Sequence, residues 1–150
     1  MKKLVLFLSV ILTVSCQQEL EPNVENINSI FDTQDFQIRF TLANGDEYRM
    51  GFLNNEMAFF SPKETIRREL SYEDARLINT FVASATLSYL ETVKKSNDKN
   101  ATAERSRSQS NRIEIYNDSK KVVFETPDYD ADFEELLTQL KLPYVSTEKK

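Results

Sequence analysis

Residues 35–60, DFQIRFTLANGDEYRMGFLNNEMAFF, decide the fold, because apolar and polar side chains alternate through them with the period of half-buried strands. Turn-forming pairs divide this stretch at Asn44-Gly45 and at Asn54-Asn55. The pattern predicts three consecutive antiparallel strands that share one apolar face.

The first turn sets how the first two strands pair. A two-residue loop at Asn44-Gly45 would turn the apolar set of the second strand to the wrong face, because a shift of one residue reverses every side chain. A three-residue loop of Ala43, Asn44 and Gly45, with Gly45 in the left-handed conformation, instead pairs Phe40 with Tyr48. We therefore expect the three-residue loop.

The second turn is expected to hold two residues, which pairs Phe52 with Met57. An aromatic run, Phe52, Phe59 and Phe60, falls in this region and raises the alternative of a ligand platform. Aromatic residues at strand spacing belong far more often to a core. We expect these three residues to be core.

Further elements follow on the C-terminal side. Ser71 to Asp74 is typical of the start of a capped helix. The sequence does not decide whether this helix continues through Leu87 to Val93. A hairpin around the turn at 117–120 pairs Ile115 with Val122, and a closing helix carries the stripe Phe133, Leu136, Leu137 and Leu140. The fold class is therefore α+β, with an antiparallel sheet of about five strands, a three-stranded meander plus a hairpin, and two helices packed on one face.

The segment 95–111 shifts to Lys, Arg, Ser, Asn and Ala and lacks large apolar residues. We expect it to be a mobile basic loop within a single domain of residues 31–145, followed by a disordered tail at 146–150. A solvated loop is the favoured interpretation, and its excess of basic residues gives contact with an anionic partner as the alternative.

The N-terminus is a targeting segment. Met1-Lys2-Lys3 is basic, and the apolar stretch 4–14 is about half of the roughly 20 residues that a spanning helix needs. It ends in Thr13-Val14-Ser15-Cys16, which resembles the lipobox of bacterial lipoproteins, although that family usually has Leu where Thr13 stands. The resemblance implies that residues 1–15 are a signal peptide and that Cys16 is lipidated. It also implies that the acylated cysteine holds the protein in a lipid bilayer.

Thr13 and Ser15 also fit ordinary signal-peptidase cleavage, which would release a secreted soluble binding protein with a free thiol. The chain has a single cysteine, and an unpaired thiol is a liability in an oxidising compartment, so lipidation is favoured. Residues 16–30 are polar and acidic and predict a flexible tether. By analogy with lipoproteins, Gln17 favours the outer membrane, facing the periplasm or the cell surface.

Composition excludes several function classes. Removal of Lys2 and Lys3 with the signal peptide leaves 17 of the 19 basic residues against 24 acidic residues, a net charge of −7. Such a chain disfavours nucleic acid. The chain has no His, and Gly45 and Gly51 are its only glycines, which excludes His-based catalysis, His-containing zinc sites and Gly-rich phosphate loops.

The acids of Asp128 to Asp132 alternate as in a calcium loop, but Phe133 and Gln139 stand where glycine and glutamate are needed. We therefore predict no catalytic, cofactor-binding or metal-binding residue and no cofactor. The expected function is a non-catalytic interaction or structural module with an envelope or extracellular protein partner.

The alternative is a proteinaceous inhibitor of a secreted or periplasmic peptidase. The order of strands, the helix LSYEDARLINTFV at 70–82, the hairpin RIEIYNDSKKVVFETPD at 112–128 and the closing helix is similar to small metallopeptidase inhibitors of the emfourin type. The glycine-rich first hairpin of that family is missing here, so no inhibitory residue is transferred.

Overall fold

The computed structural model describes residues 17–98, 110–126 and 130–144. They form an α+β fold of one mixed, mostly antiparallel seven-stranded sheet and three helices. In chain order the elements are β1 (Gln18–Leu20), α1 (Val24–Phe31), β2 (Asp35–Thr41), β3 (Glu47–Leu53), β4 (Glu56–Phe60), β5 (Thr65–Glu69), α2 (Tyr72–Asp98), β6 (Asn111–Tyr116), β7 (Lys120–Thr126) and α3 (Asp130–Gln139).

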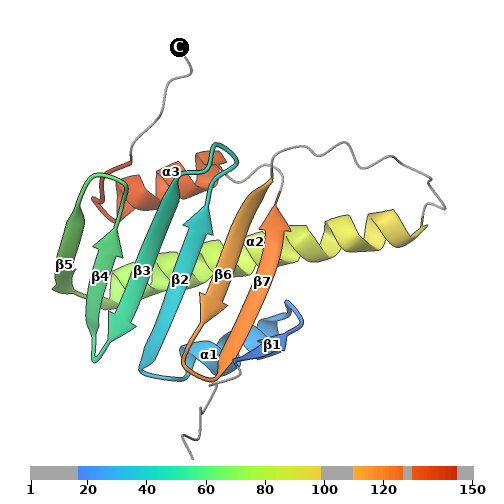
Figure 1. Cartoon of the computed structure of the whole chain (residues 1–150), viewed down its shortest axis with the longest axis horizontal. Coiled ribbons are helices and arrows are strands. Elements are labelled where there is room, and N and C mark those ends of the chain that lie inside the picture. The colour runs from blue at the N-terminus through green and yellow to red at the C-terminus, as the bar shows by residue number, and fades with distance from the viewer. Residues whose placement is uncertain (1–16, 99–109, 127–129, 145–150) are drawn as a thin grey trace, which may run out of the picture.

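The strand order in the sheet is β1-β7-β6-β2-β3-β4-β5 (Figure 1). β1 runs parallel to β7, and every other neighbouring pair is antiparallel. The meander β2-β3-β4 and the hairpin β6-β7 therefore join through β2 and β6 at the middle of the sheet.

The predicted registers are confirmed. Phe40 lies opposite Tyr48 and Phe52 lies opposite Met57, while Ile115 lies opposite Val122 in the second hairpin. Gly45 has φ 94°, the left-handed conformation that the three-residue loop requires. Alternation therefore predicted both the pairing and the face of each of these strands.

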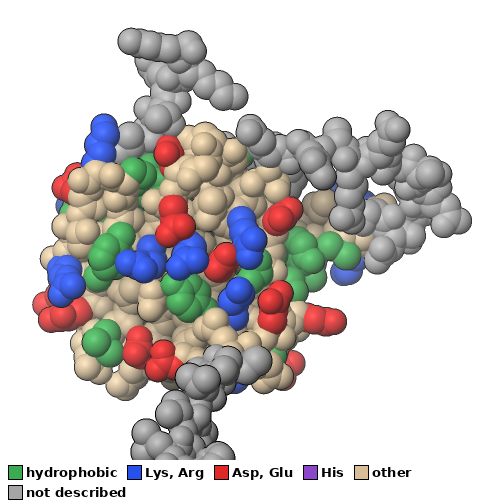
Figure 2. Space-filling model, viewed as in Figure 1, with side chains coloured by type: hydrophobic (Ala, Val, Ile, Leu, Met, Phe, Trp, Pro, Cys, Tyr) green, Lys and Arg blue, Asp and Glu red, His purple; other side chains and the backbone are tan. Residues whose placement is uncertain are grey.

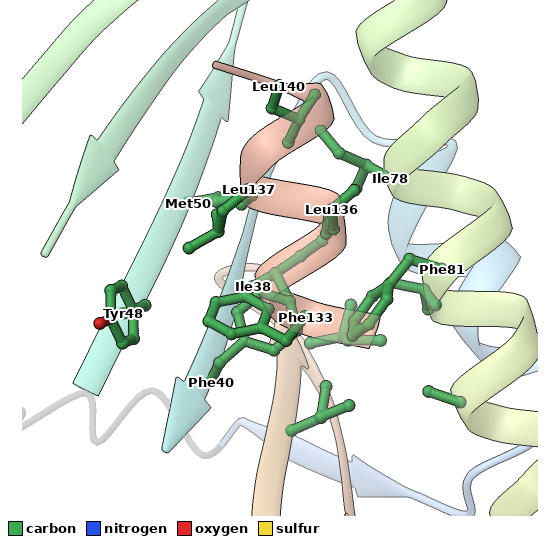
Figure 3. Close-up of a cluster of buried hydrophobic side chains, with 14 of the residues drawn as sticks. Ile38, Phe40, Tyr48, Met50, Ile78, Phe81, Phe133, Leu136, Leu137 and Leu140 are labelled. Carbon is green, nitrogen blue, oxygen red and sulfur yellow. The ribbon is translucent and has the colours of Figure 1, made fainter. Parts of the chain in front are cut away.

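All three helices cover one face of the sheet (Figure 1). Between the two layers lies the core, where Phe133 of α3 meets the aromatic rings of the sheet (Figure 3). The ring centroid of Phe133 is 4.4 Å from that of Phe40 and 5.3 Å from that of Tyr48. Met50, Ile78 and their neighbours complete this buried cluster.

The expected flexible tether at residues 16–30 is wrong from Gln18 onward, because β1 and α1 occupy this stretch, and the domain starts before residue 31. Asn23 caps α1 by accepting a hydrogen bond from the Asn26 backbone N–H at 2.8 Å. Ile27 and Ile30, one turn apart, are buried in the core. Burial of these two side chains holds α1 against the sheet.

The expected count of about five strands and two helices is also too low. β1, β5 and α1 were missed, because β1 has three residues and β5 presents only Ile66 as an apolar side chain. Arg68 of β5 points to the helix layer, where an ion pair with Asp74 takes the place of an apolar contact. An edge strand of this kind does not show simple alternation.

The stretch 87–93, left open by the sequence, is helical, since α2 continues to Asp98. The expected basic loop at 95–111 is therefore wrong at both ends, because 95–98 belong to α2 and Asn111 belongs to β6. Residues 99–109, the expected signal peptide 1–15, Cys16 and the expected tail 146–150 lie outside the described residues.

Candidate functional site

The candidate site lies on the side of the sheet opposite the helices, which we call the open face. No helix that the structure describes lies over it (Figure 1). Figure 2 shows Lys and Arg side chains gathered across the middle of this face, with hydrophobic side chains between them. The side chains of the open face that matter below are Asp35, Gln37, Arg39, Glu47, Arg49, Gly51, Leu53, Glu56, Ala58, Phe60, Arg67, Arg112, Glu114 and Tyr116.

One part of the open face is an ion-pair network over β2, β3 and β6. Arg39 Nη1 lies 3.5 Å from Glu114 Oε2, and Arg39 Nε lies 3.5 Å from Glu47 Oε1. Arg112 Nε lies 2.9 Å from the other oxygen of Glu114. Glu114 therefore balances two arginines, and its side chain is only 12% exposed.

Tyr116 extends this network along β6. Its hydroxyl donates a hydrogen bond to Gln37 Oε1 at 3.0 Å and accepts one from Arg39 Nη2 at 3.4 Å. The Arg39 guanidinium carbon also lies 5.6 Å from the centre of the Tyr116 ring. The charged groups of this half of the face are thus bound to one another.

The other half of the open face contains a hollow of about 360 Å³. Gly51 and Ala58, which lie opposite each other on β3 and β4, are the smallest residues that line it. Larger side chains stand around this pair and form the wall. The hollow is lined by Asp35, Gln37, Arg49, Gly51, Phe52, Leu53, Glu56, Met57, Ala58, Phe60 and Arg67.

Arg49 is held over the ring of Phe60, with its guanidinium carbon 4.3 Å from the ring centre. This stacking is a cation–π contact. The Arg49 Nε is buried and has no hydrogen-bond partner in the structure. A buried donor without an acceptor is uncommon in folded proteins.

The hollow has charge of both signs. Arg49 and Arg67 line it together, and Asp35 and Glu56 line it beside Leu53. Leu53 is 54% exposed although it is a large apolar residue. The hollow therefore offers cationic, apolar and anionic contacts within one small area.

Phe60 is the residue that the sequence interpretation misplaced. Phe52 and Phe59 are buried in the core as expected, but Phe60 is half-buried on the open face beneath Arg49. The sequence could have shown this, because Phe59 and Phe60 are consecutive and consecutive strand residues point to opposite faces. Only one residue of the pair Phe59 and Phe60 belongs to the core.

Cys16, the predicted lipidation residue, lies outside the described residues, but the chain directly after it is fixed to the sheet. The Gln17 side-chain amide donates hydrogen bonds to the backbone oxygens of Asn117 and of Lys120. The Gln18 backbone N–H donates to Ser119 O at 2.8 Å. The sheet therefore begins two residues after Cys16.

Two other stretches that the sequence singled out fall at least partly outside the described residues. These are most of the basic segment 95–111 and residues 128–129 of the acidic run. Within the described ranges, no group of three or more acidic or cysteine side chains is placed to hold a metal ion. None of the helices in those ranges is both long and apolar enough to span a bilayer.

Comparison of the chain with protein-family models, with curated protein sequences and with solved structures finds no match.

Proposed function

We propose that this protein is an envelope lipoprotein, held to a membrane by acylated Cys16, and that it acts there as a non-catalytic module binding a protein partner through the open face. The lipobox-like Thr13 to Cys16 supports the anchor. Two acyl chains on the cysteine give stable attachment to a membrane, whereas a single chain gives only marginal attachment. The proposed location is the outer membrane.

The observation that carries the binding role is the asymmetry of the fold. Three helices bury one face of the sheet, and no described element covers the other face, which presents arginines, Phe60 and Tyr116. Arginine and aromatic residues are enriched where proteins bind one another. The open face has this composition around its hollow.

The anchor and the open face are compatible in space. Only Gln17 separates Cys16 from β1, and β1 lies at one edge of the sheet beside β7. Because β1 is an edge strand, an anchor at this point is attached beside the open face and not on it. The hollow lies toward the opposite edge, over β2, β3, β4 and β5.

The test is site-specific photocrosslinking in intact cells from two positions of matched exposure. Leu53 lies on the open face and is 54% exposed, and Leu87 lies on α2 and is 55% exposed. A photoreactive amino acid at position 53 is expected to form a crosslink to one envelope protein. The same amino acid at position 87 is expected to give no such product. A crosslink of equal yield from both positions, or none from position 53 in the membrane-bound protein, would refute the binding role of the open face.

A further inference from the structure

The ion pairing of the arginines distinguishes the hollow from the rest of the described surface. The described residues include six arginines, of which Arg39, Arg68, Arg76 and Arg112 form ion pairs. Arg49 and Arg67 form no ion pair with a described residue, and both line the hollow. From this, we propose that the hollow binds a carboxylate side chain of the partner protein, with a neighbouring apolar side chain against Phe60 and Leu53. The inference rests on the proposed function, because it names the chemistry of that partner.

Guanidinium groups suit a carboxylate ligand. Their N–H donors form charge-assisted hydrogen bonds with carboxylate oxygens, and these bonds are about twice as strong as neutral ones. Arg49 is already oriented by its contact with the Phe60 ring at 4.3 Å, so less side-chain freedom is lost on binding. The Arg49 Nε has no hydrogen-bond acceptor in the structure, so no described side chain already occupies this donor.

Gly51 supplies an independent argument. Glycine in a strand interior destabilises a protein relative to alanine, and it often marks a place where a ligand approaches the backbone. A Cβ atom added at Gly51 would meet Gln37 Cγ at 3.9 Å and Ala58 O at 4.0 Å, which is ordinary contact. The fold therefore has room for a side chain at this position. A side chain at position 51 would fill the floor of the hollow.

Size and charge define the class of ligand. A volume of about 360 Å³ is near the lower end of ligand sites, which suits one or two side chains of a peptide segment. Asp35 and Glu56 flank Leu53 at one end of the hollow, so a single carboxylate bound at Arg49 and Arg67 lies away from them, whereas a long polyanion such as nucleic acid or an anionic lipid surface would also meet these acids. A partner segment with one acidic and one apolar side chain fits both limits.

The experiment uses the full chain purified in detergent micelles, with the Ala58 methyl group labelled with carbon-13 and observed by NMR. The probe is the peptide N-acetyl-Phe-Glu-amide, and its matched control is N-acetyl-Phe-Gln-amide, which differs only in the charge. We expect a saturable shift of the Ala58 methyl signal with the Glu peptide and about tenfold weaker binding of the Gln peptide. Sodium acetate tests the free carboxylate and is expected to bind more weakly than the Glu peptide.

Two substitutions assign the effect to the hollow. Arg67→Gln should weaken the Glu peptide about tenfold, whereas Arg76→Gln should leave it unchanged, because Arg76 pairs with Glu73 on the helix layer. Gly51→Val should abolish the shift while circular dichroism stays that of the wild type. Equal shifts with the Glu and Gln peptides, equal loss in Arg67→Gln and Arg76→Gln, or no shift at tens of millimolar Glu peptide would overturn the inference. If crosslinking from position 53 persisted in that case, the open face would still bind a partner, but by other chemistry.

Discussion

Asp74 and Arg68 together join α2, β5 and the chain just after α3. The two carboxylate oxygens of Asp74 accept hydrogen bonds from Arg68 Nη1 at 2.9 Å and Nη2 at 3.1 Å, which link α2 to β5. Arg68 Nη2 also donates to Leu140 O at 2.9 Å, just after α3. Ser71 completes the helix cap through bonds in both directions with Asp74.

These contacts fix the charge of Asp74. Burial raises the pKa of the Asp74 carboxyl, but hydrogen bonds from Arg68 and Ser71 outweigh burial, so this pKa lies below its ordinary value. A lowered pKa in the folded state means that the charged carboxylate stabilises the fold above the ordinary pKa of the unfolded chain, about 3.9. This stabilisation is lost as the pH falls through the folded-state pKa.

Asp74→Asn removes the charge and keeps the shape of the side chain. We expect it to lower the free energy of unfolding by about 2 kcal/mol near pH 7, because the buried pair with Arg68 is broken. The difference from the wild type should shrink below about pH 4 in urea unfolding.

Glu73→Gln is the matched control, since Glu73 and Arg76 form an exposed pair on the same helix. It should leave the free energy of unfolding unchanged within error. A loss in Asp74→Asn that did not depend on pH would contradict the role assigned to its carboxylate.

At the scale of single elements, α1 is part of the domain and not of a linker. Ile30 is completely buried, whereas Val24 on the same helix is 46% exposed. The cap at Asn23 and the spacing of Ile27 and Ile30 were visible in the sequence, but the surrounding polar and acidic residues favoured a tether. Tertiary packing decides the state of so short a helix.

Ile30→Ala should therefore lower the free energy of unfolding by about 3 kcal/mol, because it leaves a cavity in the core. Val24→Ala should change it by less than about 0.5 kcal/mol. Chemical denaturation of the two variants beside the wild type measures both values. If residues 16–30 were a tether in solution, both substitutions would be neutral.

The strands of the meander and the second hairpin were predictable because each shows alternation across a recognisable turn. Of the two loops compared at Asn44-Gly45, only the three-residue loop placed both Phe40 and Tyr48 in the core. β1 and β5 were not predictable, since each lies at an edge of the sheet and buries little apolar surface of its own. Backbone pairing with β7 and β4 sets the positions of β1 and β5, and the sequence alone does not indicate which strands pair.

At the scale of the whole molecule, the candidate site depends on the strand order. The hollow needs Gln37 of β2, Gly51 of β3, Ala58 of β4 and Arg67 of β5 side by side. Alternation along one strand places each of these residues on the solvent side, but it says nothing of the strand beside it. The sequence therefore predicted helices on one face of the sheet but not the hollow on the other face.

Two surfaces of one sheet have separate roles in the proposed function, one in attachment and one in binding. The edge at β1 continues directly from Cys16, and the open face lies free of the helix layer. Attachment through Cys16 would hold the domain close to the bilayer, because Gln17 is already bound to the backbone of the β6–β7 turn. The central claim is that this attachment exists and is covalent.

Metabolic labelling with a radioactive fatty acid, followed by membrane fractionation, tests this claim most directly. The wild-type protein and a Ser15→Ala control, which keeps a small residue before the cysteine, should carry the label and sediment with membranes. Cys16→Ser should lose the label and leave the membrane fraction. Retention of Cys16→Ser in membranes, or a wild-type protein without label, would contradict the account.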